Sequence, residues 1–202
     1  MGPIDLEVAH GTARAHVNRR RSPTGRLVLG HGAGGGVDAA DLLAVDAAAA
    51  AAGWTIARVE QPYRVAGRRA PAPARQLDAN WIDVVAQLRE RFGPTVPVVV
   101  GGRSMGARVA CRTAGALEAR GVLCLAVPLQ PGPRKGVPVP DRLHELDAVT
   151  VPTLVVQGTK DPFGMPPARR GRHVEQVAGD HSLDADLPAV ATAVVSWLDG
   201  VR

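Results

Sequence analysis

Residues 96–112 read VPVVVGGRSMGARVACR, and this stretch decides the fold. Residues 96–100 form an apolar, β-branched run that predicts a buried strand, and residues 107–112 predict a helix. Between them, the pattern G-x-S-x-G is centred on Ser104. A strand, this pattern and a helix are together typical of a nucleophile elbow, a sharp turn that exposes a serine hydroxyl. Glycines are expected in the pattern because β-carbons there would strike the adjacent strand and helix. The alternative interpretation is an ordinary Gly/Ser turn.

Strands and helices alternate on both sides of this turn. After an N-terminal hairpin, strands are expected at residues 26–29, 54–59, 96–100, 122–127, 152–157 and 173–177. Helices are expected at residues 38–52, 75–92, 107–120 and 187–198, with a partly helical segment at 143–149 and loops at 61–73 and 128–140. This alternation predicts an α/β fold in which helices cover both faces of a mostly parallel sheet. The chain of 202 residues is expected to form a single domain over residues 1–202.

The most distinctive polar and glycine-rich features each follow an expected strand. The segment HGAGGG, residues 31–36, follows the strand at 26–29, and Ser104 follows the strand at 96–100. Asp161 and His181 come just after the last two expected strands. Because ligands bind outside the carboxyl ends of parallel strands, we expect these residues to meet in one site.

Three residues are candidates for nucleophilic catalysis. A serine hydroxyl is a weak nucleophile near neutral pH, so Ser104 needs a base, and the base needs an orienting partner. His181, in a Gly/Asp/Ser loop, is the expected base, and Asp161, directly before Pro162, is the expected orienting acid. The order Ser–Asp–His along the chain is one of the known triad orders. The alternatives are a solvated loop histidine and an Asp-Pro turn.

Two neighbouring residues compete for these roles. His173 is a second histidine in this part of the chain, but it begins an expected strand. Asp180 is a second acid, but a residue adjacent to His181 rarely reaches the required side of its ring. We therefore expect neither to take part.

An acyl-transfer site also needs two N–H donors for the oxyanion of the tetrahedral intermediate. One is expected from Met105, the residue after the serine. The other is expected from the glycine-rich loop, with Ala33 as the first choice and Gly34 as the second. The competing interpretation is a phosphate-binding loop. Gly30, Gly32 and Gly35 have glycine spacing of this kind, but the helix junction with a paired acid that a dinucleotide-binding loop requires is not evident, and the chain has no Gly-Lys-Ser/Thr element.

Composition restricts the remaining possibilities. The net charge is +5, with basic clusters that include residues 19–21 and 68–69, and only 3% of residues are aromatic. No nucleic-acid-binding motif accompanies the clusters, so we expect solvated arginines and no nucleic-acid partner. Cys111 and Cys124 fall in expected core elements without metal-ligand spacing, so we expect buried free thiols, no metal and no cofactor. No signal peptide or membrane span is evident, and we expect a cytoplasmic protein. The oligomeric state stays open.

Five sequence blocks resemble the α/β-hydrolase superfamily across nearly the whole chain. They are HGAGG (31–35), GGRSMG (101–106), VPL (127–129), QGTKDPFG (157–164) and GDHS (179–182). More narrowly, the chain resembles the small α/β-hydrolase-like group with testis-expressed and KANSL-type proteins, near the dienelactone-hydrolase-like branch. The resemblance implies a parallel sheet with an antiparallel start and a triad of Ser104, Asp161 and His181. Dienelactone hydrolases proper carry cysteine at the elbow, whereas this chain carries serine.

Larger hydrolases of this superfamily insert a lid between the strands expected here at 122–127 and 152–157. In this chain the gap is residues 128–152, which is too short for a full lid domain. An open, shallow site follows, and the substrate expected for it is a small or accessible carboxylic ester or thioester. The alternative is a non-catalytic binding or scaffold protein that keeps the pocket.

Overall fold

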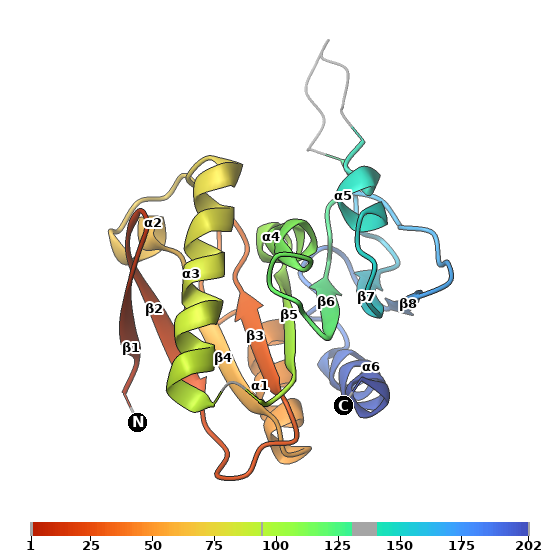
Figure 1. The fold of residues 1–202 in the computed structure, drawn as a ribbon. Coiled ribbons are helices and arrows are strands. Elements are labelled where there is room, and N and C mark those ends of the chain that lie inside the picture. The colour runs from red at the N-terminus through yellow and green to blue at the C-terminus, as the bar shows by residue number, and fades with distance from the viewer. Residues whose placement is uncertain (1, 94, 131–140, 202) are drawn as a thin grey trace.

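The computed structural model describes residues 2–93, 95–130 and 141–201 (Figure 1). Its strands are β1 (Ile4–Val8), β2 (Gly11–Asn18), β3 (Arg26–Gly30), β4 (Thr55–Glu60), β5 (Val98–Arg103), β6 (Gly121–Leu125), β7 (Thr153–Gly158) and β8 (Arg172–Val177). Its helices are α1 (Ala40–Ala51), α2 (Pro62–Val65), α3 (Ala74–Phe92), α4 (Met105–Thr113), α5 (Leu143–Asp147) and α6 (Leu187–Gly200).

The strands form one eight-stranded sheet in the order β1-β2-β4-β3-β5-β6-β7-β8. β1 and β2 form an antiparallel hairpin, and β2 pairs antiparallel with β4. From β4 to β8 all neighbours are parallel. The expected α/β fold, with a mostly parallel sheet and an antiparallel start, is confirmed.

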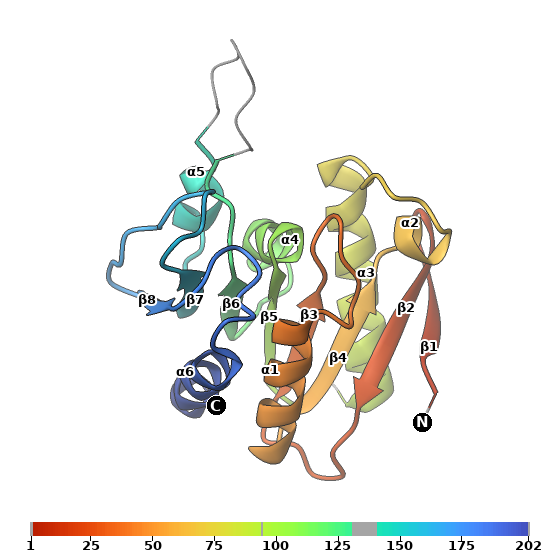
Figure 2. The ribbon, with the colours of Figure 1, turned by 180° about the vertical axis from the view of Figure 1, so that it is seen from behind.

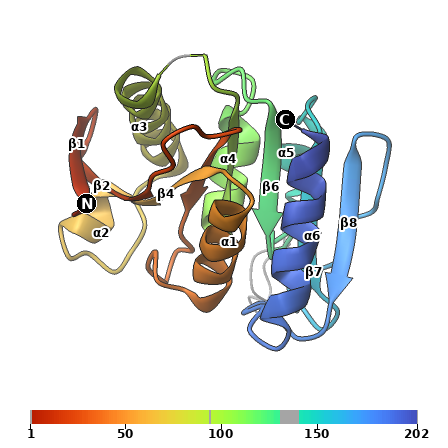
Figure 3. The same ribbon diagram turned by 90° about the horizontal axis from the view of Figure 1, so that it is seen from below.

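Helices cover both faces of the sheet because its central strands are apolar on both sides. In β5, Val98 and Val100 belong to the cluster packed under α3 and α4, whereas Val99 belongs to the cluster packed under α1 and α6. Figure 2 shows α1 and α6 on the near face, and Figure 3 shows α3 and α4 on the opposite side of the sheet. A strand whose residues are buried in both directions reads as a continuous apolar run, which is the pattern of residues 98–100.

The order of the strands reverses between β3 and β5, near the middle of the sheet. From β3 the chain goes through α1 to β4 on one side, and β5 then pairs with β3 on the other. The connections after β3 and β5 therefore leave in opposite directions and open a crevice at the carboxyl edge. The glycine-rich loop and Ser104 both lie at this point.

Two elements differ from the sequence prediction. The helix expected over 107–120 ends at Thr113. The residues that follow do not continue it, because Leu117 and Ala119 pack in the core and, directly before β6, the Arg120 N–H bonds the Val98 carbonyl. The segment at 61–73, expected as a loop, contains α2, which Pro62 starts with a preset φ and no N–H to satisfy. Part of the expected loop at 128–140, residues 131–140, lies outside the described residues.

Between β6 and β7, the described residues contain one helix, the five-residue α5. The stretch is too short for an additional domain, so the expected absence of a full lid domain is confirmed.

Candidate active site

Ser104 lies on a strained turn between β5 and α4. Its φ is 52° and its ψ −108°, outside the regions that L-residues favour. The turn is closed by a hydrogen bond from the Ser104 N–H to the Leu125 carbonyl of the neighbouring strand, 2.9 Å long. A β-carbon on Gly102 or on Gly106 would lie 2.4 Å from the Gly30 carbonyl oxygen. Both glycines of the turn are therefore required by the close approach of β3.

The structure brings the three candidate residues into one hydrogen-bonded chain. His181 Nε2 lies 3.0 Å from Ser104 Oγ, and His181 Nδ1 lies 2.9 Å from Asp161 Oδ2. The Asp161 side chain is 1% exposed and the His181 side chain 21%. A carboxylate that accepts from Nδ1–H leaves Nε2 as the acceptor for the serine proton, which is the protonation pattern a general base needs.

The sequence did not reveal how Asp161 is held. Gln157 Nε2 donates to Asp161 Oδ2 at 2.8 Å, and the Phe163 N–H donates to Oδ1 at 2.9 Å. The Phe163 ring also packs edge-on against His181, with 4.5 Å between ring centroids. A signal was present in the sequence, because Gln157 directly follows the apolar run of residues 154–156, where a polar side chain that becomes buried needs a hydrogen-bond partner.

The two competing residues lie apart from the serine. The His173 side chain is 63% exposed and sits 3.2 Å from Glu175. Asp180 turns toward Ser182, whose N–H and hydroxyl it accepts at 2.9 and 2.8 Å, and these bonds lower the pKa of Asp180.

Both expected oxyanion donors border the serine. A cavity of about 480 Å³ at the carboxyl edge is lined by Ser104, Met105 and Ala33. Within the part of the chain that the structure describes, neither the Ala33 N–H nor the Met105 N–H donates to another protein group. The Gly35 N–H bonds the Gly32 carbonyl and closes the loop on itself. Two unpartnered N–H groups beside a serine hydroxyl can donate hydrogen bonds to a negatively charged oxygen.

Tyr63, the only tyrosine of the chain, was missed by the sequence reasoning. It lies on α2, in a segment expected to be a loop, and its hydroxyl donates to the Ala33 carbonyl at 3.1 Å. The same oxygen lies 3.9 Å from Met105 Sδ. Burial raises the pKa of Tyr63 to about 12, so the hydroxyl stays protonated and available as a donor. Tyr63 thus touches both residues that carry the two free N–H groups.

The buried side chain of His31 holds the start of the glycine-rich loop in place. It is fully buried, its Nδ1 lies 2.7 Å from the Gly32 carbonyl oxygen, and its Nε2 accepts the Gln61 N–H at 3.2 Å. Since Nε2 accepts, the proton of the neutral ring is on Nδ1. Burial lowers the pKa of His31, and a second proton would have to displace the Gln61 bond.

A pH dependence of stability follows from His31. Its pKa is lowered from 6.5, so the unfolded chain binds more protons than the folded one as the pH falls below 6.5. The stability that the neutral His31 ring contributes is fully present above pH 6.5. It is lost progressively as the pH falls from 6.5 toward the lowered pKa of the folded state. Urea titrations at pH 7.5 and 5.5 should show a smaller pH effect in His31→Asn than in the wild type. The exposed-histidine control His173→Asn should keep the wild-type difference, and an unchanged difference in His31→Asn would contradict the prediction.

Ion pairs hold one wall of the cavity over Ser104. Arg108 binds both oxygens of Glu145 at 2.7 and 2.6 Å, and Arg112 binds both oxygens of Asp78 at 2.8 and 2.6 Å. Burial alone would raise the pKa of Glu145, but the hydrogen bonds and charge of Arg108 lower it. The pairs join α3, α4 and α5, so the wall is tied to three helices.

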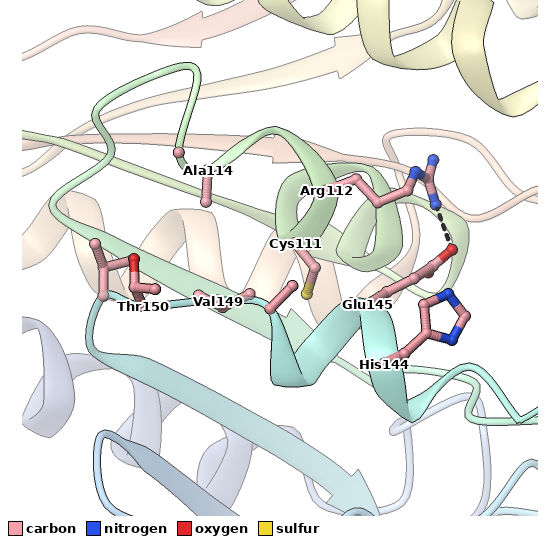
Figure 4. A pocket seen from close by; sticks show the side chains of 10 residues that line it. Cys111, Arg112, Ala114, His144, Glu145, Val149 and Thr150 are labelled. Carbon is pink, nitrogen blue, oxygen red and sulfur yellow. Dashed lines mark hydrogen bonds and ion pairs between the residues drawn. The ribbon is translucent and has the colours of Figure 1, made fainter.

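A second cavity of about 350 Å³ lies between α4 and α5 (Figure 4). Arg112 lines both cavities, whereas Ser104 lines only the first. The second cavity reaches Cys111, whose Sγ lies 3.5 Å from Cys124 Sγ; both cysteines are free thiols in the core. The contact with Cys111 and burial raise the pKa of Cys124 well above its ordinary value, so that thiol stays protonated.

Over residues 2–93, 95–130 and 141–201, no group of three His, Cys, Asp or Glu side chains is placed to hold a metal ion. In the same ranges, no helix has both the length and the apolar character needed to cross a membrane.

Known proteins share this architecture. An α/β-hydrolase domain family matches residues 23–186, which include all the site residues described above. A dienelactone hydrolase from Anabaena variabilis is 15% identical, with 98% of this chain and 96% of that chain covered and a TM-score of 0.78. Est1E from Butyrivibrio proteoclasticus is 14% identical, with 100% and 99% covered and a TM-score of 0.76.

A serine hydrolase without a lid from Xanthomonas campestris is also similar, with 16% identity, 98% and 94% covered and a TM-score of 0.76. No curated protein matches the chain. The likeness to the solved structures is one of fold, and the family match spans most of the sequence. The chain therefore belongs to the α/β-hydrolase domain family.

Proposed function

We propose that the protein is a serine hydrolase that cleaves small carboxylic esters or thioesters through an acyl-enzyme. The observation that carries the proposal is the hydrogen-bonded chain from Ser104 Oγ through His181 to Asp161, at 3.0 and 2.9 Å. A buried acid, a partly exposed histidine and a serine on a strained turn form the combination that activates a serine hydroxyl.

The reaction follows from these contacts. Ser104 Oγ attacks the acyl carbon while His181 Nε2 takes the hydroxyl proton, and Asp161 stabilises the imidazolium that results. His181 then gives the proton to the leaving alcohol or thiol, and the acyl group stays on Ser104. In the second half, His181 takes a proton from water, the hydroxide attacks the acyl-enzyme, and Ser104 recovers its proton from the imidazolium.

The oxyanion of each tetrahedral intermediate is bound by the Ala33 and Met105 N–H groups. They line the same cavity as Ser104, and Met105 is the first residue of α4, where the helix dipole adds partial positive charge. Every step uses protein groups and water, so the mechanism needs no cofactor. The absence of a lid domain favours small or accessible substrates, and we expect the enzyme to work in the cytoplasm.

Labelling with a fluorophosphonate probe tests the proposal, because such probes react with a serine only when a base activates it. Wild-type protein should be labelled at Ser104, and Ser104→Ala should not be. Labelled protein should also lose its activity against p-nitrophenyl acetate and butyrate. Folded wild-type protein that neither reacts with the probe nor turns over either ester would favour the non-catalytic binding protein instead.

Removing the Tyr63 hydroxyl should slow catalysis without weakening substrate binding. In Tyr63→Phe, the Ala33 carbonyl loses its 3.1 Å hydrogen bond, so the glycine-rich loop is held less firmly beside Ser104. We expect kcat to fall about 10-fold, less than the loss of a direct oxyanion donor, with KM nearly unchanged. Steady-state kinetics with p-nitrophenyl acetate measure both constants. A rise in KM at constant kcat would assign Tyr63 to substrate binding and contradict the prediction.

A further inference from the structure

Arg103, the residue before the nucleophile, does not line the cavity over Ser104. Its side chain is 17% exposed and turns toward the interior, where Nε lies 3.0 Å from Asp41 Oδ2 on α1. Its Nη2 donates to the carbonyl oxygen of His181 at 3.0 Å. A single guanidinium thus connects the end of β5, the first turn of α1 and the loop that carries His181.

The glycine-rich loop also packs on this guanidinium. A β-carbon on Gly32 would lie 3.0 Å from Arg103 Nη1 and 3.6 Å from the Ser104 β-carbon. Only a planar, multidentate cation can fill this position, because Asp41 and the His181 carbonyl approach two different nitrogens.

Asp41 supplies the charge that keeps Arg103 in place. The carboxylate is fully buried and accepts the Leu42 N–H at 2.9 Å. Burial raises the pKa of Asp41, and the strongest opposing influence is the charge of Arg103. A buried carboxylate needs this cation beside it, so the two side chains hold each other.

The loop that carries His181 needs such an anchor. It ends at Leu183, whose side chain packs in the core and whose φ of 57° is costly for an L-residue. At its start, the Gly179 carbonyl accepts the Lys160 N–H. Among the described residues, Arg103 is the only one whose side chain hydrogen-bonds the backbone of His181. A shift of this loop would move Nε2 away from Ser104 Oγ.

We propose that Arg103, held by Asp41, is a positioning residue that fixes His181 against Ser104. The inference rests on the proposed function for its catalytic consequence, but the anchoring itself can be measured independently of any activity.

Arg103→Lys is the principal test. Lysine keeps the positive charge opposite Asp41 but has one nitrogen, which cannot reach both Asp41 and the His181 carbonyl. We expect the melting temperature to stay near the wild-type value. The kcat for p-nitrophenyl acetate should fall about 100-fold, because a small misplacement of a catalytic group has an effect of this size, and KM should change little. Amide hydrogen exchange over residues 179–183 should be faster than in the wild type.

If Arg103→Lys folds poorly, the neutral pair Arg103→Gln with Asp41→Asn replaces it, since no buried charge is left without a partner. The matched control is Arg58→Gln with Asp46→Asn, which removes another ion pair of α1, 2.7 Å long and remote from His181. The control should keep the wild-type kcat and the wild-type exchange over residues 179–183.

The outcomes separate the two proposals. A wild-type protein that hydrolyses no ester and takes no fluorophosphonate contradicts the proposed function, while the exchange measurement still decides whether Arg103 anchors the loop. An active wild type with normal kcat and normal exchange in Arg103→Lys overturns the positioning role alone. A loss of kcat without faster exchange also overturns it, because Arg103 would then act by another route.

Discussion

Ser104→Ala is expected to lower kcat/KM for ester hydrolysis by at least about 10⁴-fold while leaving the fold intact. In the proposed mechanism the serine hydroxyl forms the acyl-enzyme, and the neighbouring His181, 3.0 Å away, has no other nucleophile within the triad to activate. The remaining rate would come from substrate binding and from the two N–H groups beside the serine. Ester hydrolysis by purified wild type and variant, with melting curves for both, measures the effect.

Ser104→Gly is the companion variant, because it separates the chemistry of the turn from its strain. Serine and alanine both have a β-carbon at the φ of 52°, whereas glycine adopts this conformation freely. Ser104→Gly should therefore be as inactive as Ser104→Ala, yet about 1 kcal/mol more stable than it. If Ser104→Ala kept wild-type turnover, the nucleophile would lie elsewhere and the proposed mechanism would be wrong.

Gly106→Ala is expected to be the most damaging single methyl addition at the elbow. The new β-carbon would lie 2.4 Å from the oxygen and 2.6 Å from the carbon of the Gly30 carbonyl. These are backbone atoms of a central strand, so β3 and α4 must separate. We expect a loss of about 3 kcal/mol in the free energy of unfolding, which lowers the melting temperature by about 10 °C. Urea denaturation and thermal melts measure this loss.

The same shift should reduce activity, since Met105 precedes Gly106 and its N–H would move with the start of α4. Gly115→Ala is the matched control: it follows α4 by two residues, and its added β-carbon would meet nothing within 4 Å. Its stability should stay within about 0.5 kcal/mol of the wild type. Equal melting temperatures for the two variants would show that the close approach of β3 and α4 does not limit the fold.

The parallel sheet and its order of elements were predictable because they depend on local patterns. A run such as residues 98–100 is buried on both sides in any parallel sheet, and the glycines around Ser104 indicate backbone contact wherever the turn occurs. The ends of elements were less predictable. The helix after Ser104 stops at Thr113 because the following residues pack into the core, which depends on β5 and β6 rather than on helix propensity.

The sequence by itself determined the fold class, the turn that carries Ser104 and the expectation that Asp161 and His181 lie beside it, since each follows a strand in a fixed order along the chain. Only the tertiary structure decided which side chains hold them. Tyr63 reaches Ala33 from a segment without a helical pattern. Gln157 reaches Asp161 because of the direction in which its side chain points at the end of β7. Arg103 points to Asp41, 62 positions earlier, and to His181, 78 positions later. Such partners leave no periodic signal, because hydrogen bonds between distant segments depend on how the sheet brings its strand ends together.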